Sequence, residues 1–176
     1  MGHPAPHPPT VLLVAAFSRY PAALEWARRR AEETWGPAAE VSEVFDFCET
    51  DYYEATMGAG LKKVFFAFDA AFDPTELPEV KRTTNRWEAE CAACCSGPEP
   101  RPLNLDPGYL TLAKLVLAST KDHAHRIYLG QGIFAEVTLV FRQGAWQAQP
   151  WTYPDYRRGD YQAFFTRLRE RLRRAG

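Results

Sequence analysis

The chain has 176 residues, which is enough for one domain with a sizeable core. A hydrophobic content of 46% with 14% aromatic residues excludes an intrinsically disordered chain, and a net charge of −1 excludes a general attraction to nucleic acid or acidic lipid. The sequence contains no run of eighteen apolar residues, and its opening segment lacks the apolar core of a signal peptide. We therefore expect a cytoplasmic protein with no membrane partner.

The first half of the chain shows strand and helix patterns in turn. Four prolines predict a flexible arm at residues 1–10, followed by a single domain at residues 11–176. Val11–Phe17 is a continuous apolar run, which is typical of a strand buried on both faces. Residues 21–35 repeat apolar side chains at helical spacing. The other elements predicted in this half are strands at 41–47 and 63–68, a loop at 49–63, a helix at about 74–91 and a proline-rich linker at 96–102.

The stretch from Asn104 to Arg142 organises the second half. Asp106-Pro107 has the pattern of a helix start, with Asp106 as the N-cap acceptor, and it predicts a helix from about Pro107 to Ser119. Apolar residues cover most of the circumference of that helix, as expected of a buried helix, and Lys114 interrupts them.

A β-hairpin is predicted after this helix, because Arg126–Leu129 and Ile133–Arg142 both alternate with period two. A three-residue loop, Gly130–Gly132, places apolar residues opposite one another, whereas a two-residue loop would set apolar against polar side chains. In the preferred register the cross-strand pairs are Leu129 with Ile133, Tyr128 with Phe134, Ile127 with Ala135, and Arg126 with Glu136.

The Arg126–Glu136 pair has two interpretations. One is a cross-strand ion pair on a solvated sheet face, worth up to about 1 kcal/mol. The other is part of a ligand site, because clusters of perturbed charges gather at functional sites. Glu136 lies inside an apolar strand, so it must reach solvent, find a partner or bind a ligand.

The last part of the chain predicts a third strand of the meander at 145–149, an aromatic loop at 150–160 and a terminal helix at 161–175. The order of elements favours an α+β fold with a mainly antiparallel sheet. Its first half follows the ferredoxin-like split pattern, with helices on one face, and a C-terminal hairpin or meander with packed helices follows. A three-layer α/β sandwich stays open as the alternative, because the first strand has the pattern of burial on both faces.

Two groups of residues raise the question of a metal. Cys91 and Cys94 have the C-x-x-C spacing of zinc and redox sites, and Cys95 follows them. A structural zinc would need a second pair of ligands, but only the isolated Cys48 and scattered histidines are available. We expect incidental reduced thiols here. On a strand His123 and His125 would share a face, but two ligands fall short of a complete site, so we predict no metal.

Short motifs occur along almost the whole chain. They include DYY at 51–53, NLDPGY at 104–109, TKD at 120–122, HRIYL at 125–129 and PWTYPDY at 150–156. Together they resemble a prokaryotic domain-of-unknown-function family, number 4416. The resemblance implies no established activity. The GTP-binding label that some members carry finds no support in the sequence, which has no G-x-x-x-x-G-K-[ST] motif to cradle phosphate.

The first functional hypothesis is an enzyme acting on an anionic small molecule, phosphorylated or nucleotide-like, near the hairpin. Lysine and arginine side chains would collect the anion, His125 would transfer a proton, and Glu136 would orient His125 or share the acid–base chemistry. Tyrosines on a glycine-flanked loop would close over the site. The candidate residues are His125 and Glu136 as catalytic residues, and Lys114, Lys121, Arg126, Asp106, Tyr52 and Tyr53 as ligand-binding residues, with no cofactor identified.

Three of these candidates also have a purely structural explanation. Lys114 can extend its ammonium past the edge of an apolar helix into water. Asp106 is accounted for by the helix cap. His125 stands at the entrance to a strand, where it is either a hydrogen-bonded edge residue or a group that titrates near neutral pH.

The second hypothesis is a binding module for RNA or for a protein partner. Aromatic side chains beside cations can stack and pair with nucleic acid. A solvated helix face and aromatic residues packed into the core would explain the same pattern, since the net charge is not basic. The residues concerned are Arg167, Arg169, Arg171, Arg173 and Arg174 of the terminal helix, and Trp151, Tyr153, Tyr156, Arg157 and Arg158 of the preceding loop.

Overall fold

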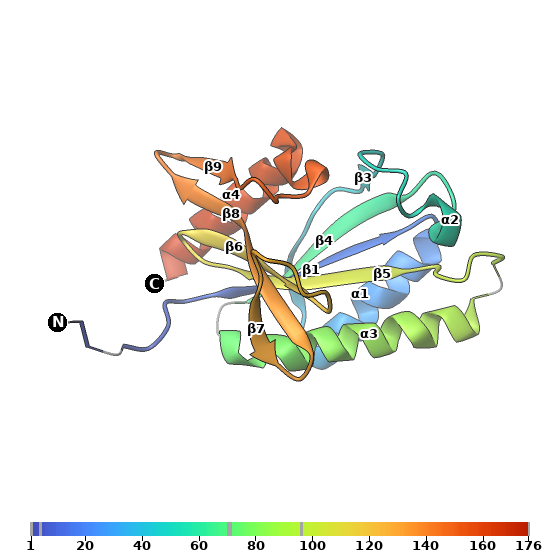
Figure 1. Ribbon diagram of the computed structural model, residues 1–176, viewed down its shortest axis with the longest axis horizontal. Coiled ribbons are helices and arrows are strands. Elements are labelled where there is room, and N and C mark those ends of the chain that lie inside the picture. Colours follow the sequence, from blue (N-terminus) through green and yellow to red (C-terminus); the bar gives the residue numbers. More distant parts are fainter. Residues whose placement is uncertain (1, 4, 70–71, 96, 176) are drawn as a thin grey trace.

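One antiparallel sheet runs through the molecule and carries helices on both faces (Figure 1). The computed structural model describes residues 2–3, 5–69, 72–95 and 97–175, and within them the sheet has nine strands. Met1 and Pro4 of the predicted arm and Ser96 of the predicted linker lie outside the described residues. The strands are β1 (Val11–Ser18), β2 (Ala38–Val41), β3 (Phe45–Asp46), β4 (Lys62–Phe68), β5 (Asn104–Leu110), β6 (Lys114–Ser119), β7 (Ile127–Gly130), β8 (Ile133–Arg142) and β9 (Ala145–Ala148). The helices are α1 (Pro21–Trp35), α2 (Glu54–Met57), α3 (Leu77–Cys94) and α4 (Gly159–Ala175), with 3-10 turns η1 (Pro74–Glu76) and η2 (Pro154–Arg157).

The first half confirms the predicted ferredoxin-like pattern. The elements β1, α1, β2, β4, α3 and β5 follow one another in the chain, and their strands lie in the order β2, β4, β1, β5. β1 pairs antiparallel with both β4 and β5, as a split βαβ unit requires. The sheet is then extended by β6, β8 and β7, so the α+β prediction is confirmed.

β1 is buried on both faces, as its apolar run indicates. Leu12, Val14 and Ala16 belong to the core that α1 and α3 cover, whereas Leu13 and Ala15 belong to the core that α4 covers. The helices of the ferredoxin-like unit therefore share one face, as predicted, while α4 covers the other face (Figure 1). The molecule thus has the three layers of the alternative fold, built on an antiparallel sheet.

The predicted helix at Pro107–Ser119 is wrong. This segment forms the end of β5, a turn at residues 111–113, and β6. Asp106-Pro107 lies inside β5, where Ala15 of β1 is the partner of Asp106. Apolar side chains on all sides are expected of a buried strand as well as of a buried helix, because both elements have every face covered. Thr111 closes the turn by donating its N–H to the carbonyl of Lys114, 2.9 Å away.

β5 and β6 pair over only part of their length. Gly108–Leu110 pairs with Leu115–Leu117, and the residues of β5 before Gly108 do not pair with β6. A side chain at Gly108 would collide with the backbone oxygen of Val116, so glycine permits the close approach at the last pair. The sheet therefore opens between β5 and β6 at the end of the two strands that is remote from their hairpin turn.

Side chains of α3 satisfy the backbone that this opening leaves unpaired. The N–H of Leu105 donates to Glu88 Oε1 at 2.7 Å, and the carbonyl of Leu105 accepts from Lys81 Nζ at 2.8 Å. Backbone groups buried without a partner are costly, so Glu88 and Lys81 replace the strand that β6 does not provide.

The β7–β8 hairpin confirms most of the predicted register. Ile127 pairs with Ala135 and Tyr128 with Phe134, and the rings of the second pair lie 5.2 Å apart. The pairing of Leu129 with Ile133 is wrong, because a bulge places Gly130 opposite Ile133. Gln131 has a φ of +56° and Gly132 of +77°, so the chain reverses over two residues in left-handed conformation.

Other predicted elements differ in their boundaries. The strand at 41–47 is interrupted at Ser42, where the side-chain Oγ takes the place of the backbone carbonyl and accepts the N–H of Phe65 at 2.9 Å. The predicted loop at 49–63 contains the short helix α2 and the beginning of β4. The strand at 145–149 is confirmed as β9, which pairs with the C-terminal half of β8. No helix in the described ranges is long and apolar enough to cross a membrane.

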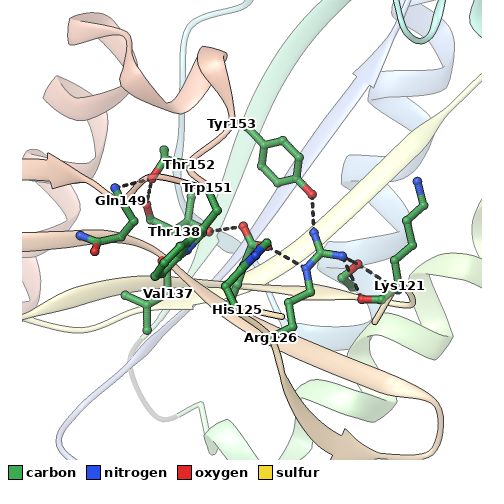
Figure 2. Close-up of polar contacts among 11 residues, drawn as sticks. Lys121, His125, Arg126, Val137, Thr138, Gln149, Trp151, Thr152 and Tyr153 are labelled. Carbon is green, nitrogen blue, oxygen red and sulfur yellow. Dashed lines mark hydrogen bonds and ion pairs between the residues drawn. The ribbon is translucent and has the colours of Figure 1, made fainter. Parts of the chain in front are cut away.

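The outer edge of β8 is shared by two strands. Its first residues pair with β7 and its last residues with β9, and the two partners leave a gap between them. The loop that follows β9 fills this gap. Trp151 Nε1 donates to the carbonyl of Val137 at 3.0 Å, and Thr152 Oγ1 donates to the carbonyl of Thr138 at 2.5 Å (Figure 2). Glu136 lies at the start of this gap.

Candidate functional site

A cavity of about 690 Å³ lies where β5 and β6 separate. It occupies the end of the α4 face of the sheet beyond the core that α4 covers, with Phe17, Asn104 and Leu117 contributed by the strands. Residues 117–126 and 151–156 supply two of its walls, and residues from Phe47 to Tyr53 supply a third. Seven of the eight predicted site residues line this cavity. They are Tyr52, Tyr53, Asp106, Lys121, His125, Arg126 and Glu136.

Glu136 is the centre of a buried polar cluster. Its Oε2 lies 2.8 Å from Arg126 Nε and 3.0 Å from His125 Nε2 (Figure 2). Glu136 is 3% exposed and the side chain of Arg126 is 4% exposed. The interpretation of this pair as an exposed ion pair on a solvated face is therefore wrong. A buried carboxylate needs both charge compensation and hydrogen bonds, and Arg126 and His125 provide them.

Arg126 uses the rest of its guanidinium within the protein. Nη1 donates to Ser119 Oγ at 2.7 Å and to the carbonyl of Lys121 at 2.9 Å, and Nη2 donates to the hydroxyl of Tyr153 at 2.7 Å (Figure 2). The side chain thus connects Glu136 to two walls of the cavity. This geometry makes Arg126 a residue that positions Glu136, with little donor capacity left for a ligand.

The imidazole of His125 is held by ring stacking as well as by its hydrogen bond to Glu136. Its ring stacks on Trp151, with centroids 5.0 Å apart and planes 9° apart, and His123 is parallel to it at 5.8 Å. When the proton is on Nε2, the imidazole donates to Glu136 and Nδ1 is the basic nitrogen. Among the described residues Nδ1 has no hydrogen-bond partner. The imidazole is therefore oriented on one side and available on the other.

Lys121 and Tyr52 stand together at the exposed side of the cavity. Lys121 Nζ lies 3.3 Å from the hydroxyl of Tyr52 and 5.3 Å from the centre of its ring. Tyr52 is 66% exposed, whereas Tyr53 packs its ring 4.9 Å from that of Phe17. Burial raises the pKa of Tyr53, so its hydroxyl stays protonated at neutral pH.

The remaining two candidates differ from their predictions. Asp106 is no helix cap: its Oδ1 lies 3.3 Å from Lys81 Nζ, and its Oδ2 accepts from Asn104 Nδ2 at 2.9 Å. Lys114 begins β6 at the opposite end of that strand from Ser119 and lies outside the cavity lining. The length of β6 separates Lys114 from the residues that line the cavity.

Sequence reasoning missed an ion pair at the closed end of the cavity. Lys63 is 2% exposed, and its Nζ lies 2.6 Å from Asp155 Oδ2. Aromatic rings surround the ammonium, and the ring of Tyr156 is the nearest at 4.5 Å. A charged residue inside an apolar strand is the signal that could have identified Lys63, as it identified Glu136. Its partner is 92 positions away, which no local pattern reveals.

A second missed group comes from α3 and from the segment before β5. Arg101 Nη2 donates to Asn104 Oδ1 at 2.6 Å and lies 3.7 Å from Glu88 Oε2. Burial raises the pKa of the Glu88 carboxyl, although nearby Lys81 opposes the shift. With Asp106, these residues form a continuous polar wall of the cavity.

The sequence profile of a family described as Domain of unknown function (DUF4416) matches residues 8–172. The chain belongs to this family. The match spans all the strands and almost all of α4, so the cavity lies wholly within the family domain. A comparison with curated proteins found no match.

The cysteines of this DUF4416 chain lie away from the cavity lining. All four are free thiols, and burial raises the pKa of Cys91 to about 11, so that thiol stays protonated and unreactive at neutral pH. Cys48 and Cys94 are exposed. Within the described parts of the chain, no three His, Cys, Asp or Glu side chains gather in a way that could hold a metal ion.

Most arginines of α4 form contacts within the protein. Arg167 pairs with Glu40 at 3.1 Å, Arg171 pairs with Asp69 at 2.7 Å, and the guanidinium of Arg169 lies 3.7 Å from the centre of the Phe141 ring. In the loop before α4, Trp151 packs on His125, Tyr153 binds Arg126 and Tyr156 is buried. The aromatic loop therefore forms a wall of the cavity, and this arrangement does not favour the RNA-binding hypothesis.

Proposed function

We propose that the chain binds an anionic small molecule in this cavity and acts on it by proton transfer at His125. The observation that carries the proposal is the buried carboxylate of Glu136, whose Oε2 accepts from both Arg126 Nε and His125 Nε2. A histidine oriented by a buried carboxylate, with its second nitrogen free, is an arrangement suited to general acid–base catalysis.

The anion-binding part of the proposal rests on Lys121. The residues described in the structure offer no carboxylate within ion-pair distance of its ammonium, which lies at the cavity mouth beside Tyr52. His123 lines the same side, and its ring is parallel to that of His125. A phosphate or carboxylate here would gain charge-assisted hydrogen bonds without displacing an existing ion pair.

In this proposal Glu136 acts through His125. Its carboxylate holds the imidazole by Nε2 and stabilises the imidazolium that forms when Nδ1 takes a proton. Arg126 positions Glu136, and Trp151 supports the plane of the imidazole. Tyr52 would close over the bound molecule and reduce its contact with water.

The binding step is tested by calorimetric titration with inorganic phosphate and with a panel of organic phosphates. We expect saturable binding to the wild type, and a loss of about tenfold or more in Lys121→Ala, since a charge-assisted contact is worth about 1.5–3 kcal/mol. Lys114→Ala is the matched control, because Lys114 lies outside the cavity and its loss should leave binding unchanged. Equal effects of the two substitutions would contradict the proposed site.

The role of His125 is tested by imidazole NMR. Phosphate should shift the ring resonances of His125 and His123 but not those of His7, which lies near Asp73, away from the cavity lining. Glu136→Gln should preserve phosphate binding but alter the His125 signals, because the amide cannot replace the carboxylate charge. Salt-dependent RNA binding that is lost when the arginines of α4 are replaced would support the alternative module instead.

A further inference from the structure

The charges that line the cavity are balanced. Five lysine or arginine side chains belong to the lining, and so do five carboxylates. Four of the cations already have a carboxylate partner in the lining: Lys63 with Asp155 at 2.6 Å, Lys81 with Asp106 at 3.3 Å, Arg101 with Glu88 at 3.7 Å and Arg126 with Glu136 at 2.8 Å.

The exceptions are Lys121 and Glu49. Glu49 lies 2.7 Å from Arg158, so its charge is compensated from outside the lining. Lys121 has no carboxylate at this distance in the described ranges. The cavity therefore has one lysine whose charge is not compensated, and this lysine can bind one anionic group of a ligand. A second anionic group would find only cations that are already paired, and their carboxylates would repel it.

The rest of the lining suits an uncharged polar molecule. A hydroxyl group both donates and accepts, so it can bridge the carboxylate and the cation of an existing pair without adding charge. Asp106, Asn104 and Arg101 present such alternating acceptors and donors along one wall. The ring of Tyr153, which is 41% exposed, offers an aromatic surface in the same lining. Aromatic surfaces between polar groups suit the carbon face of a ring that carries hydroxyls.

We propose that the cavity selects a molecule with a single anionic group and an uncharged, hydroxyl-bearing body, as in a sugar monophosphate. The anionic group lies at Lys121 and His123, and the body extends along the paired charges toward Asp106. This inference rests on the proposed function and adds the class of ligand. A nucleoside triphosphate or a bisphosphate would place further negative charge against Asp106, Glu88 or Glu136 and is selected against.

The selection is tested by titrating the wild type with phosphate, fructose 6-phosphate, fructose 1,6-bisphosphate, fructose and GTP. We expect fructose 6-phosphate to bind at least tenfold more tightly than phosphate or fructose, and the bisphosphate and GTP to bind no more tightly than phosphate. The titrations are done at pH 8, because burial raises the pKa of Glu88 and a higher pH favours its carboxylate. If phosphate binds but fructose 6-phosphate is no tighter, or if GTP is tighter, the ligand class is wrong and the anion site stands. If none of these anions binds, the proposed function fails, and this inference with it.

A charge-changing variant gives an independent test. Glu88→Gln frees Arg101 while the amide oxygen can still accept the N–H of Leu105, so the cavity gains a second uncompensated cation. The preference for fructose 6-phosphate over the bisphosphate should then fall at least fivefold. Glu90→Gln is the matched control, because Glu90 lies on the same helix as Glu88 but outside the cavity lining, where it pairs with Arg30 of α1 at 2.6 Å. An unchanged preference in Glu88→Gln, or an equal change in both variants, would overturn the argument from charge balance.

Discussion

The two halves of the β5–β6 hairpin differ in almost every property, although they belong to the same two strands. Near the turn, Gly108–Leu110 and Leu115–Leu117 form a ladder whose side chains are largely buried among apolar residues. Beyond Gly108 the ladder stops, and the same strands carry Asn104, Asp106 and Ser119 into the cavity. The first half uses backbone hydrogen bonds between strands, and the second uses side chains in their place.

This difference shows how a change in pairing creates a site for chemistry. Where strands separate, buried backbone groups need other partners, and charged side chains such as Lys81 and Glu88 supply them. Those charges then need partners of their own, so one interruption in a sheet brings several ion pairs together. The apolar half should therefore depend on the packing of its side chains, and the polar half on its ion pairs.

The largest effect should come from breaking a buried ion pair of the cavity into which the polar half opens, the pair between Lys63 of β4 and Asp155. Lys63→Met leaves the carboxylate of Asp155 buried without its cation, which should lower the free energy of unfolding by about 3–5 kcal/mol in urea denaturation. The double variant Lys63→Met/Asp155→Leu should recover most of this loss, because neither charge remains. Lys62→Met removes an exposed ion pair with Asp46 and should cost far less, because water screens the two charges. A similar loss in Lys62→Met would argue against the importance of burial.

The apolar half should respond to lost volume instead of lost charge. Leu115 is fully buried, so Leu115→Ala should lower the free energy of unfolding by about 2–5 kcal/mol, through lost transfer energy and the cavity left behind. The same urea titration measures it. Leu112 is partly exposed in the turn of the same hairpin, and Leu112→Ala should cost clearly less.

The point where the halves meet should be sensitive to a single methyl group. Gly108→Ala would push a Cβ into the backbone oxygen of Val116, so the strands must separate at their last pair, and a loss of about 1–3 kcal/mol is expected. Gly159→Ala has open space around the added atom and serves as the control. Amide exchange of residues in β5 and β6 should quicken in Gly108→Ala alone; equal exchange in both variants would contradict the steric argument.

The smallest effect should appear in the pH dependence of stability. Because burial raises the pKa of Glu88, the native state binds a proton there more tightly than the unfolded chain does. Proton binding by Glu88 therefore stabilises the native state at low pH. The free energy of unfolding falls as the pH rises from the pKa of a carboxyl in the unfolded chain through the raised pKa of Glu88 in the native state. Glu88→Gln should remove that decline, whereas Glu90→Gln should keep it. Urea titrations from pH 4 to pH 8 measure both, and parallel curves for wild type and Glu88→Gln would contradict the assignment.

The sequence was informative where partners are close in the chain. Arg126 and Glu136 are ten positions apart, and the alternation of β7 and β8 was enough to bring them together. The ferredoxin-like order followed from the same kind of local pattern. Lys63 and Asp155 are joined only by the packing of the loop after β9 onto the sheet, and periodicity contains no information on that contact.

The error at Pro107–Ser119 has a different cause. A cap residue followed by proline and an apolar run satisfies the rules for a helix start, but an apolar run alone does not distinguish a buried helix from buried strands. Gly108 within the proposed first turn favoured the strand, because close approach of two backbones requires a residue without a side chain. Placing this segment in a helix also made Asp106 a cap residue, so its contact with Lys81, and with it the polar wall, could not be foreseen.

The loop that fills the gap in the edge of β8 has a consequence for motion. Its contacts with the sheet and the cavity include those of Trp151 with Val137, of Tyr153 with Arg126 and of Asp155 with Lys63. Moving any one of these side chains away also disturbs the surroundings of His125 or of the buried lysine. Residues 151–155 should therefore detach as one cooperative unit, so that the wall of the cavity opens in a single step and its hydrogen bonds exchange together.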